Sequence, residues 1–547
     1  IPLIGTYNRF GWNHPGPAMF WTLAPLSGLV GRPSWATLVG GAMLQGAAIV
    51  ALAALAWRKG GLALVAIFLA LNGLAYGAFG AALLLWPWNP SIAFPFLGVL
   101  VLLSWSIADG DTRLVPFAVL VGTFLVQTHV GYAPLVLVAI GFSVVAAVRT
   151  SRASPERAMR WKRPLLWSGA ILVLTWAPVV AHELLRRPNV ERLGRFLWSA
   201  PGEPRLGLSS AAGIVGEAFA LPPPWLGGRT ELDSFTNAVV PASAAWLLVP
   251  FGLLAVAGVA VRRPEGRRLG RLVGLVTLLV VTGLWSISRV AGPAERYVFY
   301  WRVPIAIATV GVAIGACWYA FGADRNLTLR RAAFGGLVVV LVWSSAATAW
   351  RVGQVGDVLS AESRAQQMLD VIGSDDALDG SVLVRAPDTS FLGLHRAVVN
   401  EFDRAGVDVR VDPDLGFQFG ESRAATVDQV DEVLYVVEGG WYVSVLSGEP
   451  GADVLWQAPA LAPDDEQELR ELQRQVWGEL VAAGRPELFT ALGSPLAGAA
   501  LADVPGLDSV AIERIAALNQ VVQGTTGCRC AVIAFKADDA PGFELPR

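Results

Sequence analysis

The sequence predicts an all-α polytopic membrane module followed by an extracytoplasmic α/β domain, and three observations lead to that prediction. Charged residues make up only 16% of the chain and hydrophobic residues 54%, whereas a soluble domain is about one quarter charged. The long apolar runs lie before residue 350, and most acidic residues lie after it. We therefore place the membrane module at 1–350 and the α/β domain at 351–547.

About ten apolar stretches in the first module are long enough to cross a bilayer, because a helix needs about 20 mostly apolar residues to span roughly 30 Å of hydrocarbon. They are 35–57, 62–86, 91–108, 113–129, 132–149, 164–182, 241–261, 270–288, 302–322 and 332–350. Ten crossings place both ends of the module on the same side of the membrane.

The short connections between these stretches alternate in charge. Alternate connections hold Arg58 and Lys59, then Arg113, then Arg149, Arg152, Arg157, Arg160, Lys162 and Arg163, then Arg262, Arg263, Arg267, Arg268 and Arg271, then Arg325, Arg330 and Arg331. Arginine and lysine accumulate in short cytoplasmic loops, so these connections are expected to face the cytoplasm. The N-terminal end and the domain after Trp350 then lie outside it.

The N-terminal end needs a segment that carries it across the membrane, and the sequence that begins at Ile1 has no such segment. We expect the intact protein to have one further transmembrane helix upstream. An outer loop would then lead from that helix into Ile1, and the present sequence would be a truncated form.

The outer segment 1–31 combines rigid, aromatic and polar residues. Its apolar part at 18–31 is too short to span and is expected to lie in the interface, where aromatic rings favour the headgroup region. Pro15 favours an extended backbone at His14, and Pro17 suits the first turn of a helix. His14 is therefore expected to be held rigidly where the helix begins. The polar candidates for substrate binding here are Arg9, Asn13 and His14.

A second group of polar residues lies at predicted outer helix ends, where such residues are candidates for function. His182 is followed by Glu183 and then by cations, and guanidinium groups suit phosphate. The candidate cations on this side are Arg186, Arg187, Arg289 and Arg296, with Arg302 nearby. The alternatives stay open, because helix-end histidines such as His129 can simply meet water and interfacial arginines can snorkel.

The connection 183–240 is the only long outer loop within the membrane module. It contains an amphipathic stretch at 190–198 and the rigid run Leu221-Pro222-Pro223-Pro224-Trp225. Because long ordered loops are usually functional, a lid or acceptor platform is one interpretation. A plain structural cap is the other.

Several other classes of site lack support. The pair Asp109 and Asp111 has the spacing of a metal-binding Asp-x-Asp, but a tight turn between helices explains it. The sequence contains neither a phosphate-binding Gly-x-x-x-x-Gly-Lys-Ser/Thr motif nor cysteine-histidine zinc spacing. We therefore predict no metal site and no nucleic-acid partner. Cys528 and Cys530 either form a local bridge or lie on one strand.

After residue 350 short apolar runs alternate with amphipathic helices, which predicts an α/β layered domain. We expect strands at 381–385, 407–411, 432–438, 441–446 and 528–535, and helices near 390–405, 464–484 and 508–522. His395 is expected to have a structural role in the first of these helices.

The segment Asn13-His14-Pro15-Gly16-Pro17, set before a short interfacial helix and many hydrophobic helices, resembles the multi-spanning glycosyltransferases of the GT-C superfamily. Within it the chain is similar to the protein-mannosyltransferase-like bacterial branch, whose members often have His-Pro-Pro at this place. The stretch 187–197 also resembles a loop of actinobacterial members. The resemblance covers about residues 1–350.

The resemblance implies an inverting membrane glycosyltransferase of the bacterial plasma membrane. Such enzymes take a sugar from a polyprenyl-phosphate donor and pass it, on the outer face, to a cell-envelope glycan or protein acceptor. Their catalytic acidic residue lies in the first outer loop, which by this topology lies upstream of Ile1; Glu183 is the weak substitute. The alternatives are a transporter or flippase of lipid-linked sugars, and a non-catalytic partner in envelope glycan synthesis.

Overall fold

The protein divides into two compact units in the computed structural model, Ile1–Gln354 and Val355–Arg547. We call them the membrane unit and the C-terminal unit, and describe each by itself. The structure describes residues 2–8, 10–30, 35–79, 83, 86–151, 161–185, 188–199, 204–226, 239, 241–292, 294–323, 326–354, 368–372, 380–387, 394–437, 440–458, 461–493, 497–501, 504–526 and 530–541.

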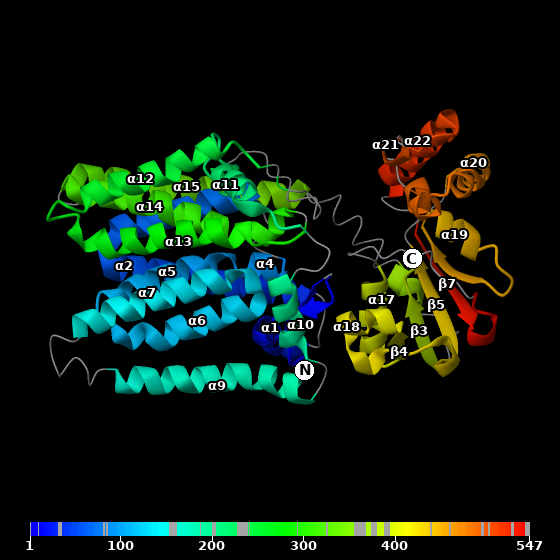
Figure 1. Cartoon of the computed structure of the whole chain (residues 1–547), viewed down its shortest axis with the longest axis horizontal. Helices are drawn as coiled ribbons and strands as arrows, with labels where there is room; N and C mark the ends of the chain where they lie inside the picture. The colour runs from blue at the N-terminus through cyan, green and yellow to red at the C-terminus, as the bar shows by residue number, and fades with distance from the viewer. Residues whose placement is uncertain are drawn as a thin grey trace. The chain divides into compact units, whose positions relative to one another are not determined.

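Each apolar stretch that was expected to cross the membrane is helical over most of its length. The helices are α2 (Trp35–Phe79), α4 (Asn89–Ile92), α5 (Phe94–Ala108), α6 (Val115–Thr128), α7 (Ala133–Ser151), α9 (Lys162–Leu185), α12 (Leu248–Ala260), α13 (Gly270–Ser288), α14 (Arg302–Ala320) and α15 (Leu327–Gln354). They run side by side in Figure 1. Among the described residues, seven helices are long and apolar enough to cross a membrane.

Helix α2 contains two of the predicted stretches and reverses direction between them. Gly60 and Gly61 have non-helical backbone angles, with φ +59° and ψ −154° at Gly61. The hydroxyl of Tyr76 donates to Gln45 Oε1 at 2.8 Å, although 31 residues of continuous helix would separate them by roughly 45 Å. The segment is therefore a helical hairpin that turns at the two glycines.

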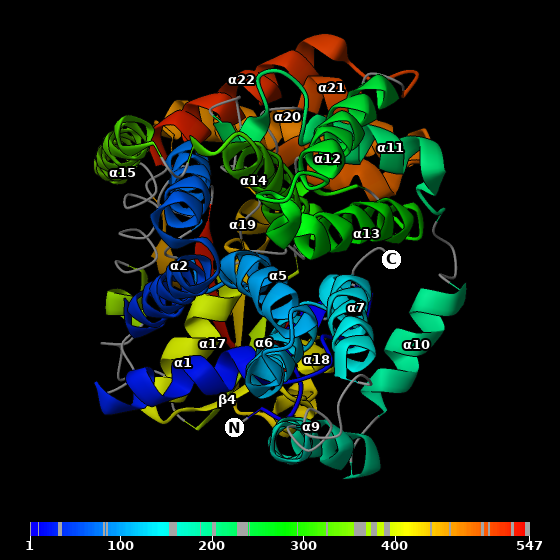
Figure 2. The same cartoon turned by 90° about the vertical axis from the view of Figure 1, so that its left-hand side faces the viewer.

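Burial divides the helices of the membrane unit into a centre and a periphery. In the apolar segments that contain α5 and α14, 89% and 78% of the residues in the apolar window are buried. In those of α9 and α15, only 17% and 11% are buried. Figure 2, which looks along the helices, shows α5 surrounded by other helices and α9 and α15 at the edge. The exposed apolar faces of α9 and α15 suit contact with lipid, where apolar side chains are not penalised.

One end of the membrane unit carries the smaller elements that connect these helices. A hairpin of β1 (Tyr7–Asn8) and β2 (Trp12–Asn13) precedes α1 (Ala18–Leu29). In the described part of the predicted loop 183–240 there are two α-helices, α10 (Asn189–Ser199) and α11 (Gly207–Glu217). Helix α10 matches the predicted amphipathic stretch. Helix α11 packs against α13 and was not expected.

The C-terminal unit is built on a mixed five-stranded sheet with the order β4-β3-β5-β7-β6. Its strands are β3 (Ser381–Arg385), β4 (Asp408–Val411), β5 (Glu432–Val437), β6 (Asp453–Gln457) and β7 (Ala531–Lys536). Its helices are α17 (His395–Ala405), α18 (Gly416–Phe419), α19 (Gly440–Leu446), α20 (Pro463–Ala482), α21 (Ala497–Leu501) and α22 (Ser509–Thr526). The expected α/β layering is present.

Alternating side chains of the central strand β5 form two separate cores. Leu434 and Val436 pack in one cluster with α17 residues such as Val398. Val433 and Tyr435 pack on the opposite face of the sheet with α19 and its surroundings. This two-sided burial explains why β5 has no polar alternation in its sequence.

The expectation of a strand at 441–446 is wrong, because this segment belongs to helix α19. Tyr442, Val443 and Leu446 are the buried residues, with exposed fractions of 4%, 2% and 0%, and their spacing matches one face of a helix. A short apolar run does not distinguish a strand from a buried helix. Strand β6 was not expected, since its side chains are mostly exposed or half-buried.

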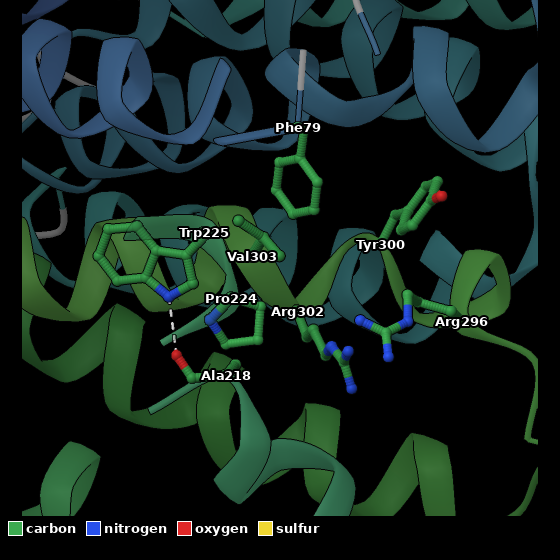
Figure 3. A pocket seen from close by; sticks show the side chains of 8 residues that line it. All are labelled: Phe79, Ala218, Pro224, Trp225, Arg296, Tyr300, Arg302 and Val303. Carbon is green, nitrogen blue, oxygen red and sulfur yellow. Dashed lines mark hydrogen bonds between the residues drawn. The ribbon is translucent and has the colours of Figure 1, made fainter. Parts of the chain in front are cut away.

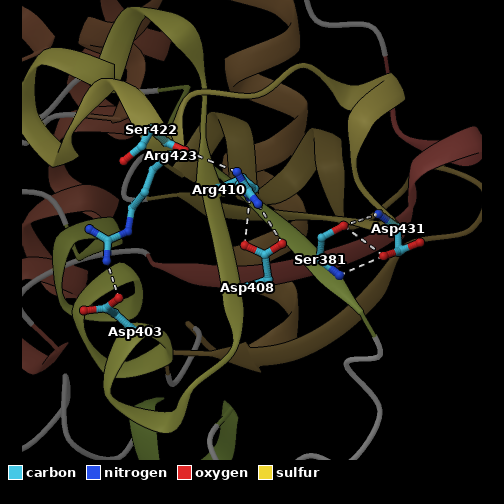
Figure 4. Close-up of polar contacts among 7 residues, drawn as sticks. All are labelled: Ser381, Asp403, Asp408, Arg410, Ser422, Arg423 and Asp431. Atoms are coloured by element: carbon cyan, nitrogen blue, oxygen red, sulfur yellow. Dashed lines mark hydrogen bonds and ion pairs between the residues drawn. The ribbon is translucent and has the colours of Figure 1, made fainter. Parts of the chain in front are cut away.

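At the β3–β4 edge of the sheet, charged side chains form ion pairs and hydrogen bonds with nearby residues (Figure 4). Arg410 on β4 donates to Asp408 at 2.8 Å and to the Ser422 carbonyl at 3.2 Å. Asp431, just before β5, accepts from the backbone N–H and hydroxyl of Ser381 at 2.7 and 2.8 Å. These contacts fix the start of β3 against β5.

Two residues of this unit were singled out in the sequence. His395 is buried at the start of α17, edge-on to the ring of Phe419, and burial lowers its pKa to about 4. It therefore lies uncharged in the core, as a structural histidine does. Cys530 is disulfide-bonded and precedes β7, while Cys528 lies outside the described residues.

The hairpin turn of α2 gives a first prediction. The backbone angles of Gly61 fall in a region that only glycine occupies readily, so Gly61→Ala should destabilise the protein by about 1–3 kcal/mol. The measurement is thermal unfolding in detergent. Gly46→Ala, in the same helix with open space around it, is the matched control and should change stability little. Equal melting temperatures for the two variants would contradict the hairpin.

Candidate functional site

The polar candidates that the structure describes gather at the end of the membrane unit that carries the β1–β2 hairpin, α10 and α11. Asn13 and His14 belong to the hairpin, and His182 and Glu183 lie in the last turn of α9. Arg289 caps α13 and is exposed, and Arg296 begins a short 3-10 turn before α14. Arg9, Arg186 and Arg187 lie outside the described residues.

His14 is buried in this end of the unit, with an exposed fraction of 4%. Its Nδ1 accepts the backbone N–H of Val130 at 3.2 Å, and its ring stacks on His129 with centroids 4.9 Å apart. Burial, with a smaller effect from His129, holds the pKa of His14 well below its ordinary value of 6.5. The imidazole is therefore neutral, and its proton lies on Nε2.

The rest of the motif around His14 is also packed. Pro15, Gly16 and Pro17 are buried, and a Cβ on Gly16 would lie 2.3 Å from the side chain of Gln127. A side chain at position 16 would therefore require Gln127 on α6 to move. The rigidity expected of this segment comes from tertiary packing as well as from its prolines.

Asn13 and Glu183 link the hairpin to α9 and α10. The backbone N–H of Asn13 donates to Asn189 Oδ1 at 2.7 Å, and the amide of Asn189 donates back to the Asn13 carbonyl at 2.9 Å. Glu183 Oε1 accepts the backbone N–H groups of Asn189 and Val190 at 2.8 and 2.7 Å. The Glu183 carboxylate thus caps α10, and this geometry explains its position without a role as a base.

A second cluster brings together Glu217 at the end of α11 and two arginines. Arg302 forms an ion pair with Glu217 and donates to the Ile214 carbonyl at 3.0 Å. Arg296 Nη1 lies 3.6 Å from Glu217 Oε1, beyond hydrogen-bond distance. Arg302 is 6% exposed, and a buried cation needs such a partner because desolvation costs several kcal/mol.

Arg296 and Arg302 both line a pocket whose other walls are largely apolar. Its lining residues are Phe79, Ala218, Pro224, Trp225, Arg296, Tyr300, Arg302 and Val303. In Figure 3 the two guanidinium groups lie close together below the rings of Phe79 and Tyr300, and the Trp225 indole donates to the Ala218 carbonyl at 2.7 Å. The Nε of Arg296 is buried and makes no hydrogen bond within the described part of the chain.

The pocket and the histidine pair lie at the same end of the unit, and α4 joins them. Trp88, just before α4, packs on Tyr297 with ring centroids 4.9 Å apart. Asn89, the first residue of α4, donates to the Thr128 carbonyl at 3.1 Å, next to His129. Direct contact of a substrate with Asn13, His14, His182 or Arg289 remains a prediction.

Glu217 was not among the candidates selected from the sequence, and Arg302 was named only as a cation near them. The sequence predicts the whole connection 183–240 as a loop, so the helix that carries Glu217 was not recognised. A signal was available, because Glu217 is the single charged residue in the apolar stretch from Gly207 to Pro224. An isolated acid in apolar surroundings usually has a cationic partner.

At the opposite end of the membrane unit, both aspartates of the Asp-x-Asp turn form ion pairs with basic side chains. Asp109 pairs with Lys59 and with Arg271, the latter at 3.0 Å, and Asp111 pairs with Arg58 at 2.7 Å. These contacts join three helix connections to one another. Across the residues that the structure describes, no three His, Cys, Asp or Glu side chains are grouped to hold a metal ion.

Comparison with solved structures gives one informative likeness. The chain is similar to the crystal structure of ArnT from Cupriavidus metallidurans bound to undecaprenyl phosphate, with a TM-score of 0.51 and 14% sequence identity. The match covers 82% of this chain and 88% of that one. The fold is therefore similar to that of ArnT.

The membrane unit accounts for 354 of 547 residues, about 65% of the chain, and the match covers 82% of it. The match therefore also includes part of the C-terminal unit. The expected polytopic fold is thus confirmed, and membership of the GT-C superfamily stays a prediction. No family model matches the sequence, and no curated protein matches it. The bacterial branch suggested by the His14 motif remains a prediction.

The cap formed by Glu183 gives a second prediction. Glu183→Ala removes an acceptor shared by two backbone N–H groups and should destabilise the protein by about 1–2 kcal/mol. Glu183→Gln retains an acceptor oxygen and should recover most of this loss in thermal unfolding. Glu191→Ala breaks an exposed pair with Arg195 on α10 and should have a smaller effect. If Glu183→Gln and Glu183→Ala melt at the temperature of the parent protein, the cap is not important.

Proposed function

We propose that this chain is a membrane glycosyltransferase that takes a sugar from a polyprenyl-phosphate donor on the outer face of a bacterial plasma membrane. The acceptor would be a glycan or protein of the cell envelope. The observation that carries the proposal is the pocket with Arg296 and Arg302 at one end of a GT-C fold. ArnT, which shares this fold, is bound to undecaprenyl phosphate in its crystal structure.

The proposed orientation rests on charge. The end opposite the pocket carries basic residues in every connection that the structure describes there, including Arg58, Lys59 and Arg271. Short cytoplasmic loops carry such residues. With ten crossings, the pocket, the β1–β2 hairpin and the C-terminal unit all lie outside the cytoplasm.

The pocket provides the chemistry that a lipid phosphate requires. Arginine forms short, charge-assisted hydrogen bonds with phosphate oxygens, and Arg296 retains unused donors that face the pocket lining. The walls formed by Phe79, Trp225 and Val303 are apolar, and surroundings of low dielectric constant strengthen these interactions. The same cations stabilise a phosphate that leaves with negative charge.

In the proposed reaction the bond between the sugar C1 and the phosphate oxygen breaks, and its electron pair goes to the phosphate. The acceptor hydroxyl forms the new bond to C1 and gives its proton to a carboxylate. Arg296 and Arg302 would stabilise the leaving phosphate. Glu183 and Glu217 are both engaged in other contacts, and neither is assigned as this carboxylate.

The central test is a comparison of two outer arginines. Arg296→Gln should weaken binding of undecaprenyl phosphate by about 10- to 100-fold, because a hydrogen bond to a charged group contributes about 1.5–3 kcal/mol. Arg195→Gln removes an equal charge from an exposed position on α10 outside the pocket lining and should change affinity by less than about threefold. Binding can be measured by the ligand-dependent rise in melting temperature in detergent.

Both outcomes of this comparison are informative. Equal losses in the two variants would assign the effect to the general positive potential of the surface. Unchanged affinity in Arg296→Gln would remove the pocket from the proposed donor site.

A further inference from the structure

The charge of the arginine pocket is set by three residues from three elements. Arg296 comes from the 3-10 turn before α14, Arg302 from the first turn of α14 and Glu217 from the last turn of α11. Tyr300 is the remaining titratable residue of the lining, and Phe79 on α2 and Trp225 in the 224–226 turn carry no charge. Neither Glu217 nor the buried Glu295 lines the pocket, and Glu217 is counted because its carboxylate pairs with Arg302 and lies 3.6 Å from Arg296.

The three charges give the pocket a net charge of +1. Arg302 is committed to Glu217 and to the Ile214 carbonyl, and it is almost completely buried. Arg296 is at 3.6 Å from the same carboxylate and keeps donors available. An incoming anion therefore meets one available cation, while Glu217 neutralises the other.

This balance discriminates between two forms of lipid phosphate. A phosphodiester, as in a sugar linked to a polyprenyl phosphate, carries one negative charge. A phosphate monoester, as in the lipid released after transfer, carries one charge at low pH and nearly two above its second pKa, which is near 6. In surroundings of low dielectric constant an unmatched charge is expensive.

We propose that Glu217 is a specificity-determining residue that matches the pocket to a singly charged lipid phosphodiester and disfavours the doubly charged monoester. The proposal rests on the proposed function and deepens it. Glu217 touches the arginines and acts through them, so it is a positioning residue. Its carboxylate orients Arg302 and cancels one charge, so the pocket favours the donor over the spent lipid.

The experiment compares two probes that differ in charge alone, undecaprenyl phosphate and its methyl phosphodiester. Glu217→Gln raises the pocket charge to +2 and should tighten binding of the monoester at pH 7.5 by about tenfold or more relative to the diester. At pH 5.0 both probes carry one charge, and the two affinities should change together. Ligand-dependent thermal shifts of the complete chain in detergent provide the dissociation constants.

Two control variants separate charge matching from a structural role. Glu217→Asp keeps the charge and should keep the preference of the parent protein. Glu191→Gln removes an outer carboxylate on α10 that is exposed, and should also leave the preference unchanged. Partial unfolding would weaken binding of both probes equally and would leave the ratio of their dissociation constants unchanged. That ratio therefore reports on selectivity.

The parent protein provides a test that is independent of any substitution, since Glu217→Gln leaves Arg302 without its partner and can fail to fold. Because the pocket disfavours the doubly charged form, the affinity for the monoester relative to the diester should fall by about tenfold or more between pH 5.0 and pH 7.5. A ratio in the parent protein that stays constant or rises for the monoester at pH 7.5, or a folded Glu217→Gln variant with the same ratio as the parent protein, would overturn the inference. Failure of both probes to bind the parent protein would instead overturn the proposed function.

Discussion

The buried ion pair between Arg302 and Glu217 is the interaction on which the proposed site depends. A guanidinium group that is 6% exposed cannot remain charged in apolar surroundings unless an anion and hydrogen-bond acceptors compensate for lost water. Glu217 and the Ile214 carbonyl provide both from helix α11. The pair therefore fixes α11 against α14 and places Arg296 at the pocket with its donors incompletely used.

The β1–β2 hairpin has a complementary role at the same end of the molecule. The neutral His14 stacks on His129, and Asn13 exchanges two hydrogen bonds with Asn189. These contacts hold α10 and the α6–α7 connection together around a small polar core. The hairpin thus stabilises the end of the bundle, and α4 connects it to the arginine pocket.

Much of the architecture was predictable because the bilayer imposes one simple pattern. The apolar stretches coincide with helices, and the reversal at Gly60 and Gly61 falls between two of them. The site was less predictable, because charge pairing depends on which helix ends meet in space. Glu217 is hidden in a segment that reads as a loop, and Glu183, a candidate base in the sequence, is a helix cap. The segment 441–446 was misassigned since its buried residues fit a strand or a helix equally in so short a run.

The assignment of functions to the two ends depends on orientation, and cysteine labelling in intact cells tests it most directly. In a Cys317→Ser background, single cysteines would replace Leu221 near the pocket, which is 76% exposed, and Glu265 in the opposite connection. Val510 on α22, 74% exposed, would report on the C-terminal unit. The background protein without added cysteines gives the baseline. If the pocket and the C-terminal unit lie outside the cytoplasm, a membrane-impermeant maleimide should label positions 221 and 510 in intact cells. It should reach position 265 only after the membrane is opened. Labelling of position 265 alone in intact cells would contradict this orientation.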